Sequence, residues 1–250
     1  MSNMGFKYSA SAVGTYMTCP RKFKLIYLDK KQTFKPKCMA DGVLLHSWFD
    51  KFYKEMPPIQ DLDINKFDEY AKIFPQELRE SYEEDIYNFL EFSKKLFLIS
   101  ENKACWKPIA TEEKFYDEEM NFVGVIDAVF SDGTNYLLLD YKTGKPKDKL
   151  TDSYQLQLCG YKHLWDRRYP DQKITHWGNL YTKGEINEIN PIIETVSLEK
   201  MNEFYINLDK VKNEIEAGNF CKTKNKFWCK KCELAIYCFG DIDSIKEGWR

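Results

Sequence analysis

Two acidic residues and one lysine near the middle of the chain have a spacing that could do chemistry. Asp140 and Lys142 follow a run of three leucines, and residues two apart on a β-strand point to the same face. Asp127 precedes them, and the segment 131–134 (Ser-Asp-Gly-Thr) predicts a two-residue hairpin turn between the two strands. Asp127 would then face Leu138 and be the diagonal neighbour of Asp140, roughly 7–8 Å away between Cα atoms. A three-residue loop would reverse the parity and separate the carboxylates.

Two carboxylates that share a cation, with an ammonium beside them, suit the hydrolysis of a phosphodiester. Aspartate oxygens are ligands that Mg²⁺ and Mn²⁺ prefer. Such an ion polarises the phosphate and lowers the pKa of a bound water, while Lys142 would orient that water or stabilise the developing charge. The competing interpretation is that Asp140 and Lys142 are ordinary polar residues at the end of a strand, and the spacing alone does not decide between the two.

A second group of residues with ligand chemistry lies near the end of the chain. Cys229 and Cys232 form a Cys-x-x-Cys pair, and Cys238 follows six residues later. This pattern is typical of a metal knuckle that needs a fourth ligand, yet the second local pair of a zinc ribbon is missing. Cys19 is the attractive choice for that ligand, and Cys221 is an alternative whose spacing fits poorly. The other cysteines are expected to pack as small apolar residues; they are Cys38, Cys105 and Cys159.

Helices and strands must position these residues, and the spacing of apolar residues that indicates them changes along the chain. Apolar residues at helical spacing dominate the first 100 residues, alternating patterns follow, and helical spacing then returns. This order predicts an α/β fold with a helical N-terminal lobe. The expected helices cover 9–17, 21–28, 41–55, 64–100 (with a break at Pro75), 152–168 and 197–217, and the expected strands cover 108–117, 121–130, 135–142, 173–182 and 185–196.

Four short motifs in a fixed order make the chain similar to a known family. They are a Gly-x-x-x-His helix, a Gly-x-x-Asp strand, an acid-x-Lys strand and a Gln-x-x-x-Tyr helix, carried here by Gly42/His46, Gly124/Asp127, Asp140/Lys142 and Gln157/Tyr161. With them the sequence resembles the PD-(D/E)XK nuclease superfamily. Within it, the sequence is similar to the RecB-like branch, which includes RecB and AddB nuclease domains and the CRISPR-associated four-cysteine exonucleases. The proline of the superfamily name is Ile126 here.

The resemblance implies a role for each matched residue. The ligands of an Mg²⁺ or Mn²⁺ ion would be His46, Asp127, Asp140 and the backbone carbonyl of Tyr141. Beside Asp127 and Asp140, Lys142 would position the nucleophilic water. Gln157 would contact the substrate or hold the catalytic groups, with Gln155 as the competing candidate. A glutamate on the first strand often joins such sites, and Glu112 fits better than Glu113.

The resemblance also implies a [4Fe–4S] cluster. Iron–sulfur members of this branch carry one cysteine before the nuclease core and three after it, which correspond here to Cys19, Cys229, Cys232 and Cys238. Four thiolates are adequate for such a cluster, and a zinc ion or free thiols are the alternatives. The cluster would join segments far apart in the chain and hold the N-terminal lobe against the tail.

The fold that the resemblance implies is a restriction-endonuclease-like core. In such a core, helices flank a mixed central sheet, to which a helical N-terminal lobe and an iron–sulfur clasp between the N- and C-terminal segments would be added. The expected domains are a helical lobe over 1–100 with one cluster cysteine and the site histidine, a nuclease core over 101–218, and a cysteine-rich tail over 219–250.

Composition and charge limit the class of protein. The chain has 250 residues, 43% of them hydrophobic, and a net charge of −2, which supports a sizeable core and argues against a generic polyanion binder. Lysine-rich segments at 21–37, 142–149 and 222–231 could follow a phosphate backbone or be solvated surface. No apolar run suits a transmembrane helix and no signal peptide is evident, so we expect a cytoplasmic protein whose eight cysteines are thiols or metal ligands.

The expected function is metal-dependent hydrolysis of DNA, with an exonuclease on single-stranded ends as the favoured version. Recombination and repair, CRISPR adaptation and viral DNA processing are the settings in which this scaffold occurs. The rival is a non-catalytic iron–sulfur DNA-binding or scaffolding subunit of a helicase–nuclease or integration complex, and an RNA-directed nuclease is a third hypothesis. Without a Walker-type loop, any unwinding must come from a helicase partner. Trp228 is the tryptophan expected to stack on bases.

Overall fold

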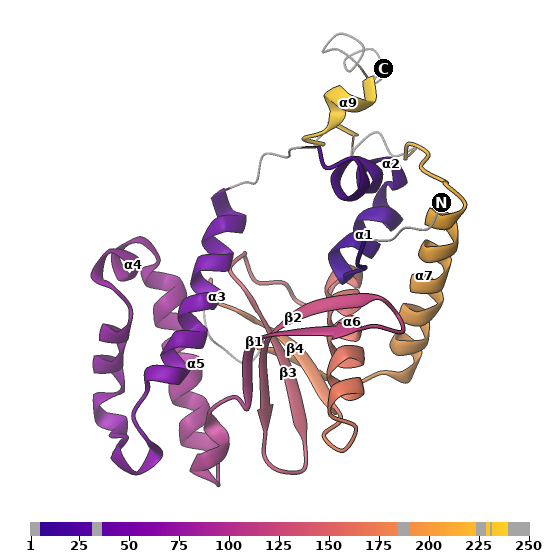
Figure 1. The fold of residues 1–250 in the computed structure, drawn as a ribbon. Coiled ribbons are helices and arrows are strands. Elements are labelled where there is room, and N and C mark those ends of the chain that lie inside the picture. Colours follow the sequence, from indigo (N-terminus) through magenta and orange to yellow (C-terminus); the bar gives the residue numbers. More distant parts are fainter. Residues whose placement is uncertain (1–5, 32–36, 185–190, 224–228, 231, 240–250) are drawn as a thin grey trace. The chain divides into compact units, whose positions relative to one another are not determined.

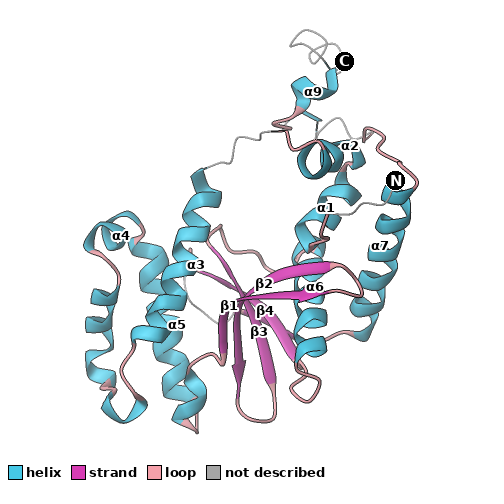
Figure 2. Cartoon of the chain, viewed as in Figure 1, coloured by secondary structure: helices cyan, strands magenta, loops and turns pink. Residues whose placement is uncertain are grey.

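A mixed β-sheet forms the centre of one compact unit in this computed structural model (Figures 1 and 2). The structure describes residues 6–31, 37–184, 191–223, 229–230 and 232–239. Its strands are β1 (Ala110–Asp117), β2 (Phe122–Ser131), β3 (Tyr136–Lys142), β4 (His176–Tyr181) and β5 (Ile192–Thr195), adjacent in that order. β3 and β4 are parallel, whereas β2–β3 and β4–β5 are antiparallel. The predicted α/β fold, a mixed sheet flanked by helices, is confirmed.

The register of β2 on β3 corrects the predicted turn. Ala128 lies opposite Leu139, and the loop between the strands has four residues, 132–135, rather than two. Continued by one position, this register puts Asp127 opposite Asp140 itself instead of on the diagonal. Because the register moves by two positions and not by one, the two carboxylates still share a face of the sheet.

The side chain of Asp132 explains the wider loop. One oxygen of its carboxylate accepts hydrogen bonds from the backbone N–H groups of Thr134 at 2.8 Å and Asn135 at 2.6 Å, and the other accepts one from the Asn135 amide at 2.9 Å. Aspartate commonly organises turns in this way. Gly133 takes a positive φ of 93°, as expected from the Asp-Gly pair, but the turn is longer than the type I′ geometry that this pair suggests.

The main hydrophobic core lies between one face of the sheet and two long helices, α3 (Lys37–Glu55) and α5 (Glu83–Ile99) (Figure 1). Phe49 of α3 stacks on Phe89 of α5 with ring centres 4.0 Å apart, and Tyr141 of β3 meets Phe49 edge-on. Burial of such large rings fixes α3 against the sheet. Short helices complete this region: η2 (Ile59–Asp61), η3 (Ile64–Ile73), α4 (Gln76–Ser81) and η4 (Lys103–Trp106).

Helix α6 (Asp152–Arg168) connects the parallel strands β3 and β4, as a parallel pair requires. The hydroxyl of Thr151 caps its first turn. Buried His163 bonds to Asp117 of β1, with 2.7 Å between Nε2 and Oδ2, which anchors the helix to the sheet. The start of α6 lies close to the end of β3, where Asp140 and Lys142 are.

The second compact unit consists of Met1–Lys35, Glu118–Val123 and Leu198–Arg250. Its helices are α1 (Ala10–Thr18), α2 (Pro20–Phe23), the π-helix η1 (Lys24–Leu28), α7 (Leu198–Glu216) and α9 (Ala235–Phe239). Ser9 caps α1 by accepting a hydrogen bond from the Ala12 N–H at 3.3 Å. The expected basic helix over 21–28 is instead a short α-helix followed by one π-helical turn, and Tyr8 forms a β-bridge with Phe122.

Some expectations are not tested by the fold. Trp228, residues 185–190 of the last predicted strand and the side chain of Cys38 lie outside the described residues. Within the described ranges no helix has the length and apolar character needed to cross a membrane. The division into three domains and the cytoplasmic location stay predictions.

Candidate metal centre

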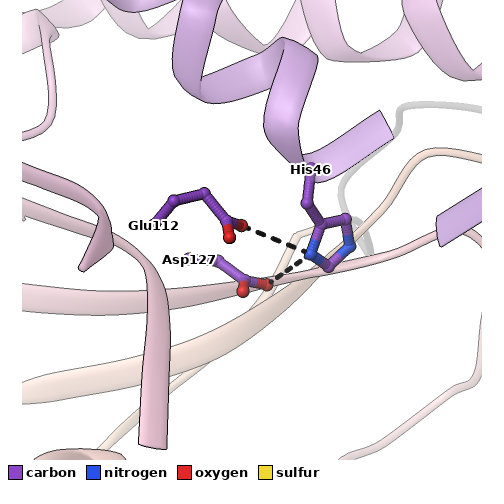
Figure 3. A group of neighbouring side chains, drawn as sticks. All are labelled: His46, Glu112 and Asp127. Carbon is purple, nitrogen blue, oxygen red and sulfur yellow. Dashed lines mark ion pairs between the residues drawn. The ribbon is translucent and has the colours of Figure 1, made fainter. Parts of the chain in front are cut away.

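Three side chains from three different elements meet beside the sheet (Figure 3). His46 comes from α3, Glu112 from β1 and Asp127 from β2, and one ligand atom of each lies within 4.8 Å of the others. Nδ1 of His46 is 3.3 Å from Oδ2 of Asp127 and 3.7 Å from Oε1 of Glu112. An imidazole nitrogen with two carboxylates is a ligand set that divalent cations accept. The fold thus brings predicted His46 and Asp127 together with Glu112.

The negative charges around this group of side chains favour the protonated forms of its members. Burial by itself lowers the pKa of His46, but Asp127, Asp140 and Glu112 together raise that pKa to about 9. Burial and the negative charge of Asp127 raise the pKa of Glu112 to about 7, with His46 opposing. Crowded carboxylates favour protons, and a cation in their midst would take the place of those protons. The electrostatics therefore suit a positive ion at this position.

Asp140 lies beside this group and is 2% exposed. Its Oδ2 atom forms an ion pair with Nζ of Lys142 and accepts a hydrogen bond of 3.0 Å from Nδ2 of Asn179. Burial, followed by the charge of Asp127, raises the pKa of Asp140 to about 6, and Lys142 opposes this rise. Both donors go to the same oxygen, so the carboxylate has one fixed orientation.

A chain of hydrogen bonds connects the lysine to α6. Nζ of Lys142 donates to Oε1 of Gln157 at 2.9 Å, and Nε2 of Gln157 donates to the hydroxyl of Tyr161 at 2.7 Å. The ammonium also lies 4.4 Å from the ring centre of Tyr154. Gln157, rather than its competitor Gln155, makes the contact with the lysine. Together with the ion pair to Asp140, these contacts restrain the ammonium of Lys142.

Two glycines of the predicted motifs leave room for neighbours. A Cβ atom on Gly124 would lie 2.9 Å from side-chain atoms of both Tyr161 and Leu164, closer than real packing allows. A Cβ on Gly42 would meet the Thr143 hydroxyl at 3.3 Å, a tight contact. Gly124 thus lets α6 approach β2, which brings Tyr161 to the end of the hydrogen-bond chain.

Sequence reasoning missed two residues of this region, Asn179 and Tyr154. Asn179 lies opposite Asp140 in the parallel register of β3 and β4 and is fully buried. Among the described residues its Oδ1 atom has no hydrogen-bond partner, although its Nδ2 atom donates to Asp140. An asparagine inside a buried strand needs polar partners, and that was the available signal. The backbone carbonyl of Tyr141 stays a predicted ligand. The backbone N–H of Tyr141 donates to Oδ2 of Asp127 at 2.8 Å.

The four predicted cluster cysteines line one cavity in the second unit. The cavity has a volume of about 160 Å³ and also borders Lys22 and Lys222; its cysteines are Cys19, Cys229, Cys232 and Cys238. Cys19 occupies the bend between α1 and α2, where its sulfur accepts a hydrogen bond from the Lys22 N–H at 3.4 Å. Cys221, the alternative ligand, is exposed and is not among the lining residues.

The thiols affect one another's protonation. Burial raises the pKa of three of them above the usual range, and neighbouring thiols add to the rise; the three are Cys229, Cys232 and Cys238. Basic residues oppose it: Lys222 acts on Cys229 and Cys238, and Lys22 acts on Cys232. Grouped thiols next to lysines are suited to binding a metal as thiolates, with their protons released to solvent when the metal binds.

Comparison with protein families gives one extensive match. The model described as the PD-(D/E)XK nuclease superfamily matches residues 7–239, which includes both the acidic group and the four cysteines.

Individual proteins give more distant likenesses. The chain is 26% identical over 191 residues to an ATP-dependent helicase/deoxyribonuclease subunit from Lactococcus lactis subsp. cremoris (strain SK11). That match covers 64% of this chain but only 17% of the relative. A crystal structure of a candidate exonuclease from Eubacterium rectale has a TM-score of 0.50 and 13% identity, covering 84% of this chain and 81% of its own. This second likeness supports the fold alone.

Proposed function

The chain belongs to the PD-(D/E)XK nuclease superfamily, and we propose that it is an Mg²⁺- or Mn²⁺-dependent deoxyribonuclease. This proposal rests on one observation: two groups of side chains lie next to each other. His46, Glu112 and Asp127 form a ligand group, and Asp140 beside them holds Lys142 in an ion pair. Carboxylates that can bind a cation, next to an oriented ammonium, are the parts that phosphodiester hydrolysis needs.

The atoms of the site support a bound cation. Oε1 of Glu112 is buried and, among the described residues, accepts no hydrogen bond; its ion-pair partner, Nδ1 of His46, is 3.7 Å away, and a bound cation would satisfy this oxygen more fully. The raised pKa values of His46 and Glu112 reflect the same excess of negative charge. In this proposal the ion would be held by His46, Glu112, Asp127 and Asp140, with the carbonyl of Tyr141.

The side chains have separate tasks in the reaction. When bound, the cation supplies Lewis-acid polarisation of the scissile phosphate and lowers the pKa of water in the site. Lys142 orients the attacking water and stabilises the negative charge that develops on the phosphate. Gln157, held in turn by Tyr161, keeps the lysine in place through a bond of 2.9 Å. Asn179 holds Asp140 from the other side.

The finer version of the proposal is an exonuclease on single-stranded DNA ends. The Lactococcus relative, whose name combines a helicase with a deoxyribonuclease, favours the RecB-like branch and a helicase partner. Recombination and repair, CRISPR adaptation and viral DNA processing are the settings we propose.

We also propose that the cysteine cavity holds a [4Fe–4S] cluster. Its four sulfur donors and two lysines suit an anionic iron–sulfur group. A tetrahedral zinc ion, with Zn–S bonds of about 2.3 Å, is the alternative occupant of the same four sulfurs.

Nuclease assays on end-labelled substrates test the function. The substrates are single strands labelled at the 5′ or 3′ end, duplex DNA and RNA, each incubated with Mn²⁺. We expect cleavage of single-stranded DNA by the wild type and a loss of about 10²–10³-fold in kcat for Lys142→Ala, because the variant removes a positive charge that acts in the transition state. Gln157→Ala should lose activity to a smaller extent.

Gln155→Ala is the matched control, since Gln155 lies on the same helix one half-turn away and, among the described residues, Lys142 donates to Gln157 and not to Gln155. It should retain wild-type kcat. If the wild type and Lys142→Ala are equally inert on every substrate and metal, the chain is a non-catalytic DNA-binding or scaffolding subunit.

A further inference from the structure

Two lysine ammonium groups contact the ring of Tyr154, a half-buried residue in the first turn of α6. The Nζ atoms of Lys142 and Lys147 each lie 4.4 Å from the centre of that ring. Twice this distance, about 8.8 Å, is the farthest apart that the two nitrogens can be. Lys147 is therefore held close to the lysine to which we assign the chemistry.

The two lysines differ in what balances their charge. Lys142 is paired with Asp140 and donates to Gln157. Lys147 is exposed on the loop 143–151, and no carboxylate of the described residues lies within 4.0 Å of its ammonium. The contact with the ring orients this ammonium but leaves its charge in place. A positive charge thus remains open to solvent beside the acidic site.

A ligand with two negative charges a short distance apart would match this pair of lysines. Successive phosphates of a nucleic-acid strand are such a ligand, because each carries one negative charge and the backbone fixes their separation. Lysine binds phosphate as a point charge and tolerates many approach directions. With Lys142 acting at the scissile phosphate, Lys147 can reach the next phosphate along the strand.

We propose that Lys147, held on the ring of Tyr154, forms a subsite for the phosphodiester adjacent to the scissile one. This proposal rests on the proposed nuclease function. It specifies a second phosphate of the substrate backbone that the protein binds. Lys149 lies on the same loop and is also exposed, but it makes no such ring contact among the described residues. It therefore provides a control with the same charge and the same loop.

Oligonucleotides with one neutral methylphosphonate linkage test the subsite. The linkage is placed at successive positions on both sides of the bond that is cut first, and kcat/KM is measured with Mn²⁺ for the wild type, Lys147→Ala and Lys149→Ala. In the wild type and Lys149→Ala we expect one position, next to the scissile bond, where the neutral linkage lowers kcat/KM roughly two- to fivefold, the size of an exposed ion pair. In Lys147→Ala this penalty should vanish.

Binding provides a second readout that does not depend on cleavage. Fluorescence anisotropy in EDTA measures Kd for the same oligonucleotides, and the slope of log Kd against log salt should fall by about 0.7 in Lys147→Ala. An equal methylphosphonate penalty in wild type and Lys147→Ala, with an unchanged salt slope, overturns the subsite and leaves the nuclease function standing. A wild type that cuts no substrate overturns the nuclease function and the subsite together, which distinguishes the two failures.

Discussion

Side chains at the candidate metal centre bind protons more tightly in the folded chain than they would when unfolded. The pKa of His46 is raised from 6.5 to about 9, so its stabilising contribution is complete below pH 6.5 and is lost as the pH rises through 9. The pKa values of Glu112 and Asp140 are raised to about 7 and about 6, from 4.5 and 3.8. Their contributions to the stability of the folded chain also fall as the pH rises, over a lower pH range than that of His46. The protein without metal is therefore destabilised at this site by increasing pH.

A divalent cation should reverse this trend, because it replaces the protons that the site releases. We expect Mn²⁺ to raise Tm more at about pH 8 than at about pH 6, relative to the same buffer with EDTA. Thermal denaturation at the two pH values measures both shifts. Glu112→Gln should reduce the dependence of the Mn²⁺ shift on pH, and Glu113→Gln, on the neighbouring position of β1, should not. A Mn²⁺ shift that is the same at both pH values contradicts the assignment of the ligands.

Helix α6 acts on the site through its distance from β2, which Gly124 sets. In Gly124→Ala the new Cβ would lie 2.9 Å from side-chain atoms of Tyr161 and Leu164, so these side chains or the helix that carries them must shift. Such overpacking costs about 1–3 kcal/mol, and it should also displace the Tyr161–Gln157–Lys142 chain. We expect a lower Tm together with a lower kcat, measured by thermal denaturation and by cleavage of labelled single strands.

Gly144→Ala is the control for this substitution, because a Cβ there would meet nothing within 4 Å. It should change neither Tm nor kcat appreciably. If Gly124→Ala lowers Tm and leaves kcat unchanged, the hydrogen-bond chain from α6 does not position the lysine.

Local patterns predicted most elements but not the pairing between them. The helix near the start of the chain, expected over 9–17, and the whole of α6 follow from residues close in sequence. The turn after β2 was predicted wrongly because the Asp132 side chain forms hydrogen bonds that the Asp-Gly pair does not reveal. Asn179 was missed because its partner, Asp140, is fixed only by the parallel register of β3 and β4. Contacts between distant segments thus limit what one sequence can show.

At the scale of the whole molecule, the two proposed inorganic groups lie in different compact units. The acidic residues belong to the unit with the sheet, and the four cysteines belong to the unit of the chain termini. Loss of the cluster should therefore loosen the second unit first, because a structural metal group contributes its binding free energy to folding. The Mn²⁺ shift of the first unit should persist.

Anaerobically purified protein tests this separation. We expect a brown protein with about four iron and four sulfide per chain, the composition of the cluster. Cys232→Ser should lose iron and be cleaved faster by protease within residues 198–223, whereas Cys105→Ser should match the wild type. Colourless protein with stoichiometric zinc contradicts the assignment, and so does equal protease resistance of the two variants.

The pairing of early and late segments in the second unit also has a consequence during biosynthesis. The backbone N–H of Arg21 donates to the carbonyl of Cys221 at 3.1 Å, and the hydroxyl of Tyr16 donates to the carbonyl of Asn219 at 2.5 Å. A ribosome adding roughly 5–20 residues per second needs roughly 10–40 s to travel from Cys19 to Cys229. During translation the sheet can assemble while Cys19 still lacks its partners. The proposed cluster can therefore assemble only after Cys238, the last of its four cysteines, has been synthesised.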